Sequence, residues 1–154
     1  MSRRASLAVA FGMALLLVGC GGGDDSGDGA AVTGGGGEGT IAVSVGETDG
    51  STMYMNVSST TAPAGEVTFV ITNEGQEEHE FEVFKTSVAA SDFGVGSDDK
   101  AIDPADAEEL VEVEGIEPGT TETTTLDLEP GHYALICNEE GHYGDGMFAD
   151  LEVT

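Results

Sequence analysis

Three side chains that can bind a soft metal lie at even spacing near the end of the chain. Cys137, His142 and Met147 form a C-x4-H-x4-M pattern with glycines between them. A thiolate, an imidazole and a thioether are donors that suit copper. A fourth donor must come from elsewhere, and the only other histidines are His79 and His132.

Strand alternation separates these two histidines. In the run HYALIC, Tyr133, Leu135 and Cys137 point to one face, and His132 points to the other. We therefore expect His132 at the surface or partly buried, away from the thiol. His79 follows a polar turn and begins a new run, which places it at a strand end. Two imidazoles, a thiolate and a weak thioether together form the blue-copper arrangement.

The elements that must position these donors are strands. From Ile41 onward the chain consists of short runs rich in Val, Thr, Ile, Tyr and Phe, separated by Gly, Pro, Asn or Asp. About eight such strands in residues 41–154 predict an all-β domain, a Greek-key β-sandwich or a small barrel. Residues 86–109 lack alternation and are expected to be a loop insertion, with one short helical turn near Pro104.

The first forty residues are predicted to serve export and tethering. Arg3 and Arg4 precede 15 uncharged residues. A helix that spans a bilayer needs about 20, so residues 1–19 are typical of a signal peptide instead. Its end, LVGC, resembles a lipobox, in which Cys20 would be acylated; an ordinary cleavage site is the alternative. Residues 20–40 form a glycine-rich linker. Twin-arginine export and the general secretory route both remain open.

The charge balance excludes one class of partner. The chain carries a net charge of −26, and without Arg3 and Arg4 it has 2 basic residues against 30 acidic ones, or −28. Nucleic acid is therefore not an expected partner, because phosphate binding needs basic patches. Self-repulsion on this scale indicates a halophilic protein whose charges are screened by salt. A monomer is expected.

Two stretches resemble the cupredoxin family. They are the C-x4-H-x4-M loop with the preceding PGHYALIC, and the N-x-G-x4-HEF stretch of Asn73, Gly75 and His79. They are most similar to small exported plastocyanin-like and halocyanin-like proteins. The resemblance implies a Greek-key sandwich over residues 41–154 that holds one type 1 copper. The copper ligands that it implies are His79, Cys137, His142 and Met147.

By this resemblance, together with the lipobox-like LVGC, the chain is expected to be a lipid-anchored electron carrier on the outer face of the cytoplasmic membrane, cycling Cu(II)/Cu(I) between redox partners. An enzyme is not expected, because four protein ligands leave no open metal position. Electrons are expected to leave through His142, with Tyr143 and Phe148 as docking contacts. A copper-delivery protein is the main alternative, although Met53 and Met55 share one strand face, as core residues do. The two remaining alternatives are a copper-free sandwich and a cysteine hydrolase.

Two features depart from the family pattern. Plastocyanins and azurins usually carry a small polar residue after the first histidine, and its side chain ties the two ligand loops together, whereas this chain has Glu80. Hydrogen bonding around the ligands is therefore left open by the sequence. In addition, Glu139, Glu140 and Asp145 surround His142, so the docking face is expected to be acidic.

Overall fold

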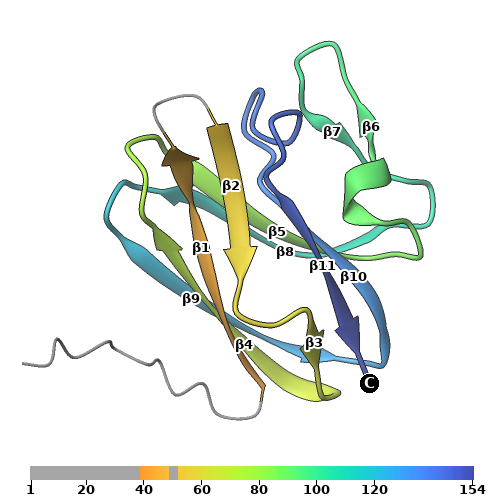
Figure 1. Cartoon of the computed structure of the whole chain (residues 1–154). Helices are drawn as coiled ribbons and strands as arrows, with labels where there is room; N and C mark the ends of the chain where they lie inside the picture. Colours follow the sequence, from red (N-terminus) through yellow and green to blue (C-terminus); the bar gives the residue numbers. More distant parts are fainter. Residues whose placement is uncertain (1–38, 49–51) are drawn as a thin grey trace, which may run out of the picture. The chain divides into compact units, whose positions relative to one another are not determined.

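The computed structural model describes residues 39–48 and 52–154, in which two β-sheets face each other as a sandwich (Figure 1). The predicted signal peptide, the predicted acylation site at Cys20 and most of the predicted linker lie outside these residues. Within the described ranges, no helix combines the length and the apolar character needed to cross a membrane.

The first sheet has four strands in the order β2-β1-β4-β9. Strand β4 shows why these residues form it, because Val67, Phe69 and Ile71 are buried in alternation with half-buried polar or branched residues. On its other face the hydroxyl groups of Thr68 and Thr125 lie 2.9 Å apart across β4 and β9. The strands are β1 (Thr40–Thr48), β2 (Thr52–Val57), β4 (Gly65–Asn73) and β9 (Thr121–Leu128).

The second sheet has five strands in the order β3-β11-β10-β5-β8. Its central strand, β10, is buried on both faces: Tyr133 and Leu135 enter the main core, whereas Ala134 and Ile136 join a second apolar cluster. The alternation predicted for this strand is confirmed. The strands are β3 (Thr61–Ala62), β5 (His79–Lys85), β8 (Glu108–Ile116), β10 (Gly131–Ile136) and β11 (Phe148–Val153).

The insertion between β5 and β8 covers the outer side of the second sheet. It contains the 3-10 helix η1 (Ala90–Asp92) and a small hairpin of β6 (Gly94–Val95) and β7 (Ala101–Ile102), seen beside the sandwich in Figure 1. The helical turn was expected near Pro104. Only a single turn forms there, in which the N–H of Ala107 donates to the carbonyl of Pro104. Phe93, at the end of η1, packs edge-on against Phe84 of β5, which fixes the turn there instead.

The prediction of an all-β sandwich is confirmed, with one correction to the strand count. Within residues 39–48 and 52–154, eleven strands form where about eight were predicted, because three two-residue strands, β3, β6 and β7, are too short to show alternation. The sheets remain open, so the fold is a sandwich and not a closed barrel.

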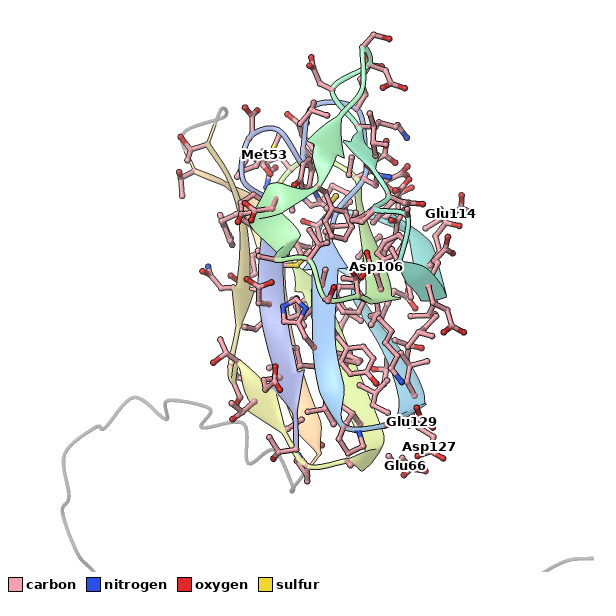
Figure 2. All side chains as sticks on the ribbon, turned by 90° about the vertical axis from the view of Figure 1, so that its right-hand side faces the viewer. Met53, Glu66, Asp106, Glu114, Asp127 and Glu129 are labelled. Carbon is pink, nitrogen blue, oxygen red and sulfur yellow. The ribbon has the colours of Figure 1, made fainter. Side chains whose placement is uncertain are left out.

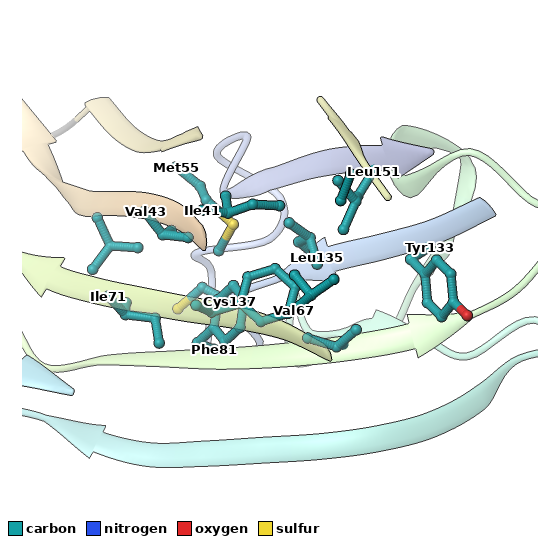
Figure 3. Close-up of a cluster of buried hydrophobic side chains, with 14 of the residues drawn as sticks. Ile41, Val43, Met55, Val67, Ile71, Phe81, Tyr133, Leu135, Cys137 and Leu151 are labelled. Atoms are coloured by element: carbon teal, nitrogen blue, oxygen red, sulfur yellow. The ribbon is translucent and has the colours of Figure 1, made fainter. Parts of the chain in front are cut away.

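The main core lies between the two sheets (Figure 3). It is built from inward-facing side chains of both sheets, and Cys137 is one of them. Acidic side chains stand out from the sandwich, and Glu66, Asp127 and Glu129 lie close together at one end in Figure 2. The sandwich thus combines an apolar interior with a highly charged exterior.

Candidate metal centre

Cys137 lies directly after β10 with its side chain fully buried. Its N–H donates to the carbonyl of Met147 (3.0 Å), and its Sγ accepts the N–H of Glu80 (3.3 Å). Burial raises the pKa of the Cys137 thiol to about 11. The metal-free protein therefore holds a thiol, and a bound metal must displace its proton.

The loop after Cys137 folds back so that His142 returns to the thiol. Gly141 and Gly146 adopt positive φ angles of 87° and 100°, which glycine allows without steric cost. The N–H of Met147 donates to the carbonyl of His142 (3.1 Å), closing the loop. As a result, Nδ1 of His142 lies 3.4 Å from Sγ of Cys137.

His79 completes the group from a distant part of the chain. It begins β5 and is fully buried. Its Nδ1 lies 3.1 Å from Nδ1 of His142 and 3.9 Å from Sγ of Cys137. The three donor atoms lie within 4.8 Å of one another. Burial, followed by the neighbouring His142, lowers the pKa of His79, which keeps its imidazole neutral and able to bind a metal.

Met147 is the fourth predicted donor. Its side chain is fully buried in the same core cluster as Cys137, and its backbone pairs with that residue. His132 is excluded, as predicted. It lies on the opposite face, where its ring nitrogens are 2.9 Å from the carbonyl oxygen of Thr86 and 2.9 Å from Oδ1 of Asp150.

The turn before His79 is held by one buried side chain. Asn73 accepts the N–H of Gly75 (2.9 Å), and its amide group donates to the carbonyls of Glu77 and Ile116, both at 2.7 Å. These bonds fix the path of the chain between β4 and β5. The N-x-G part of the motif therefore positions the first histidine.

The family follows from the sequence match. Residues 40–154 match the family model described as the sulfocyanin (SoxE) domain. The chain belongs to this family. No curated protein matches the chain.

Solved cupredoxin structures share the fold of this sulfocyanin-family domain. Auracyanin from Roseiflexus castenholzii is 22% identical with a TM-score of 0.51, over 77% of this chain and 99% of that one. Rusticyanin from Thiobacillus ferrooxidans is 18% identical with a TM-score of 0.53 (77% and 79%). Azurin Az-iso2 from Methylomonas sp. strain J is 19% identical with a TM-score of 0.53 (75% and 97%).

The residues of this sulfocyanin-family chain fit one type 1 copper. Two imidazole nitrogens and one sulfur converge in a buried space, which is the trigonal donor set of that metal site. Their chemistry suits this metal, because imidazole nitrogens and a thiolate are donors that copper prefers and all three face the same buried space. The predicted set of His79, Cys137, His142 and Met147 is therefore the ligand set.

Glu80 stands where plastocyanins and azurins carry a small polar residue. It is 7% exposed, and its carboxyl group lies near that of Glu139 in the loop after Cys137. Burial, followed by the neighbouring Glu139, raises the pKa of Glu80 to about 7. A carboxyl group that keeps its proton does not repel a neighbouring carboxylate, so the two ligand-bearing segments can lie close together here.

Tyr143 was predicted at the docking surface, and this is wrong. Its side chain is only 3% exposed, and its hydroxyl donates to the carbonyls of Ala90 (2.8 Å) and Phe93 (3.2 Å). Its ring packs against Phe148, with ring centroids 5.5 Å apart. The insertion covers Tyr143, so this residue joins the insertion to the ligand loop.

Two carboxylates beside the ligands escaped the sequence analysis. Nε2 of His142 lies 3.5 Å from Oε2 of Glu77, and Nε2 of His79 lies 3.6 Å from Oε2 of Glu47. For Glu47 a signal existed, because it follows Val43 and Val45 at an inward-facing position of β1. An acid at such a position needs a buried partner.

Proposed function

We propose that this protein is a type 1 copper electron carrier. The observation that carries the proposal is the convergence of the buried donor atoms of His79, Cys137 and His142, with Met147 buried beside them. Copper bound there would supply a one-electron Cu(II)/Cu(I) change. The thiolate and imidazoles suit both oxidation states, and a thioether favours Cu(I).

Two features support a carrier over a catalyst. The donors come from backbone segments that are fixed by hydrogen bonds, so a change of copper oxidation state would need little movement of the chain. All four ligand residues are at most 7% exposed, which leaves little room for substrate or water at the metal. Catalytic metal sites keep such a position open.

Matched variants test the ligand assignment. Cys137→Ser removes the thiolate and should abolish both the blue absorption and reversible reduction of the copper-loaded protein. His132→Ala changes a histidine on the opposite face and should leave both intact. If His132→Ala and Cys137→Ser affect the spectrum equally, the proposed site is wrong.

We place the electron exit at His142. It is the ligand in mid-loop, and its outer nitrogen lies beside Glu77, whose side chain is half exposed at 51%. Gly144 is exposed in the same loop without a positive φ, so Gly144→Lys should fold and slow electron exchange. Thr123→Lys adds the same charge on β9 and should not. Equal exchange rates in both variants would place the exit elsewhere.

The membrane anchor is proposed from the sequence. LVGC followed by a glycine-rich linker supports acylation of Cys20, and more than one acyl chain is needed for stable anchoring. We propose attachment to the outer face of the cytoplasmic membrane, as a monomer, with redox proteins as partners. Mass spectrometry of membrane-extracted protein should show the lipid, and Cys20→Ala should release the protein. An unmodified soluble mature form would refute the anchor.

Copper delivery remains the second candidate, without a specific observation in its favour. Met55 is buried in the core and Met53 packs against it, so neither offers a surface site for copper exchange. A delivery protein must release its metal, whereas an electron carrier retains it. For an electron carrier we expect copper to pass to a competing chelator only slowly, over a time that covers many redox cycles.

A further inference from the structure

A buried carboxylate faces the outer side of the first histidine ligand. Glu47 lies near the end of β1, with its side chain only 4% exposed, and His79 is fully buried. Oε2 of Glu47 and Nε2 of His79 are 3.6 Å apart, and within the described residues neither atom has a hydrogen-bond partner. Leaving two such polar atoms unpaired in the interior costs free energy, so their mutual approach needs an explanation.

The surrounding backbone is built to hold this carboxylate. Its second oxygen, Oε1, accepts the N–H of Gln76 at 2.6 Å. Gly75 leaves the space that the carboxylate occupies, since a Cβ at that position would collide with Oε2 of Glu47 and with the backbone of Gly46. The N–H of Glu74 donates to the carbonyl of Val45 (2.9 Å), which ties β1 to the turn before His79. The carboxylate of Glu47 is therefore held by the N–H of Gln76 and by close packing against Gly75.

The nitrogen with which His79 faces the metal determines which nitrogen can donate a hydrogen bond to Glu47. Nδ1 of His79 points toward Cys137 and His142, so Nε2 is the nitrogen left to carry a proton when copper is bound. A metal-bound histidine usually donates this second N–H to a carboxylate, a carbonyl or water, and the partner fixes the ring and makes it a stronger ligand.

We propose that Glu47 is a positioning residue that accepts the Nε2–H of His79 and stabilises Cu(II) relative to Cu(I). This inference rests on the proposed function. A buried negative charge one imidazole away from the metal favours the more positive oxidation state, and the low dielectric of the interior strengthens the effect. Glu47 therefore lowers the reduction potential.

The other histidine ligand provides a matched control within the same molecule. Glu77 approaches Nε2 of His142 at 3.5 Å, nearly the distance of the Glu47 pair, but its side chain is 51% exposed. Exposed pairs are weakened by water and salt. The two carboxylates thus differ mainly in burial, and the same substitution at each isolates its effect.

The test is the reduction potential of the copper-loaded protein with Glu47→Gln or Glu77→Gln, at low salt and in 1 M NaCl. Glutamine keeps the shape and an acceptor oxygen but removes the charge. For Glu47→Gln we expect the Cu(II)/Cu(I) ratio at a fixed ambient potential to fall at least tenfold at both salt levels. A tenfold fall corresponds to a rise of about 59 mV in the reduction potential. For Glu77→Gln we expect less than a threefold change, and less still in 1 M NaCl.

A second readout needs no variant. In the diamagnetic Cu(I) protein, NMR should show a slowly exchanging Nε2–H on His79, and its absence would overturn the inference. An unchanged potential in Glu47→Gln, or equal shifts in both variants, would also overturn it. If the wild-type protein is blue and one of these results is found, only this inference is contradicted. A wild-type protein that binds no copper contradicts the proposed function as well.

Discussion

The two faces of the second sheet have different chemistry, although the same strands form both. On the inner face of β5, His79, Phe81 and Val83 point into the main core and toward the metal centre. On the outer face, Glu80 and Glu82 are buried almost as deeply, at 7% and 5% exposure, under the insertion. The inner face is stabilised by apolar packing, whereas the outer face carries carboxyl groups that lose hydration.

This difference shows how a sandwich adapts to a covering insertion. In an uncovered antiparallel sheet, polar outer residues would face water. Here the insertion encloses them together with the aromatic cluster of Phe84, Phe93 and Tyr143. We infer that the outer face attaches the insertion to the ligand loop, and that the inner face supplies the stability of the fold.

Phe81→Ala should have the largest effect, because it removes a fully buried ring that packs against Phe69 at 5.3 Å between centroids. The expected loss is about 3–5 kcal/mol in the free energy of unfolding, measured by denaturant titration. Phe93→Ala is the matched change on the outer side and should cost clearly less. Equal losses would remove the distinction between the two faces.

Salt should stabilise the protein by acting on its charged exterior. Raising NaCl from 0.1 M to 1 M shortens the Debye length from about 10 Å to about 3 Å, so repulsion within a chain of net charge −26 falls. We expect a gain of about 2 kcal/mol in unfolding free energy. Near pH 4, where many carboxylates are protonated, the gain should shrink. A midpoint that falls with NaCl would contradict a halophilic adaptation.

Glu82→Gln should stabilise the protein at high pH. Burial, with the charges of Glu80, Glu112, Glu109 and Asp103, raises the pKa of Glu82 to about 8. The folded state therefore keeps the proton that the unfolded chain loses above about pH 4.5, and stability falls as pH rises from there to about 8.

For Glu82→Gln we expect a gain of about 2 kcal/mol at pH 8 and almost none near pH 4.5, from thermal unfolding across this range. Glu112→Gln is the control, because Glu112 is the exposed cross-strand partner of Glu82. The account of the outer face fails if both variants behave alike at every pH.

Tyr143→Phe should have the smallest effect. It removes the hydroxyl that donates to the carbonyls of Ala90 and Phe93, at a cost of about 1 kcal/mol. Hydrogen exchange should become faster in the insertion and stay unchanged in β4. The copper spectrum should be nearly intact, because Tyr143 faces away from the metal. A lost spectrum with unchanged exchange would place Tyr143 in the metal site.

Local alternation was enough to predict the inner face. It placed Tyr133, Leu135 and Cys137 on one face of β10 and separated His132 from the ligands. The strand start at His79, after a polar turn, was also correct. These features depend on a period of two residues and on turn residues that the sequence displays.

The outer face could not be predicted in the same way. Glu80 and Glu82 are buried because the insertion folds over them, and this is a long-range contact without periodicity. Tyr143 was misplaced for the same reason, since Ala90 and Phe93, its partners, lie about fifty residues earlier. Glu47 was missed because its partner, His79, comes from another sheet.

The central claim is that the inner face of the second sheet ends in a type 1 copper site. Titration of the purified protein with Cu(II), followed by visible and EPR spectroscopy, tests it most directly. The account predicts an intense blue absorption from the Cys137 thiolate that saturates at one copper per chain and disappears reversibly on reduction. Stoichiometric binding of Cu(II) without blue colour would contradict it.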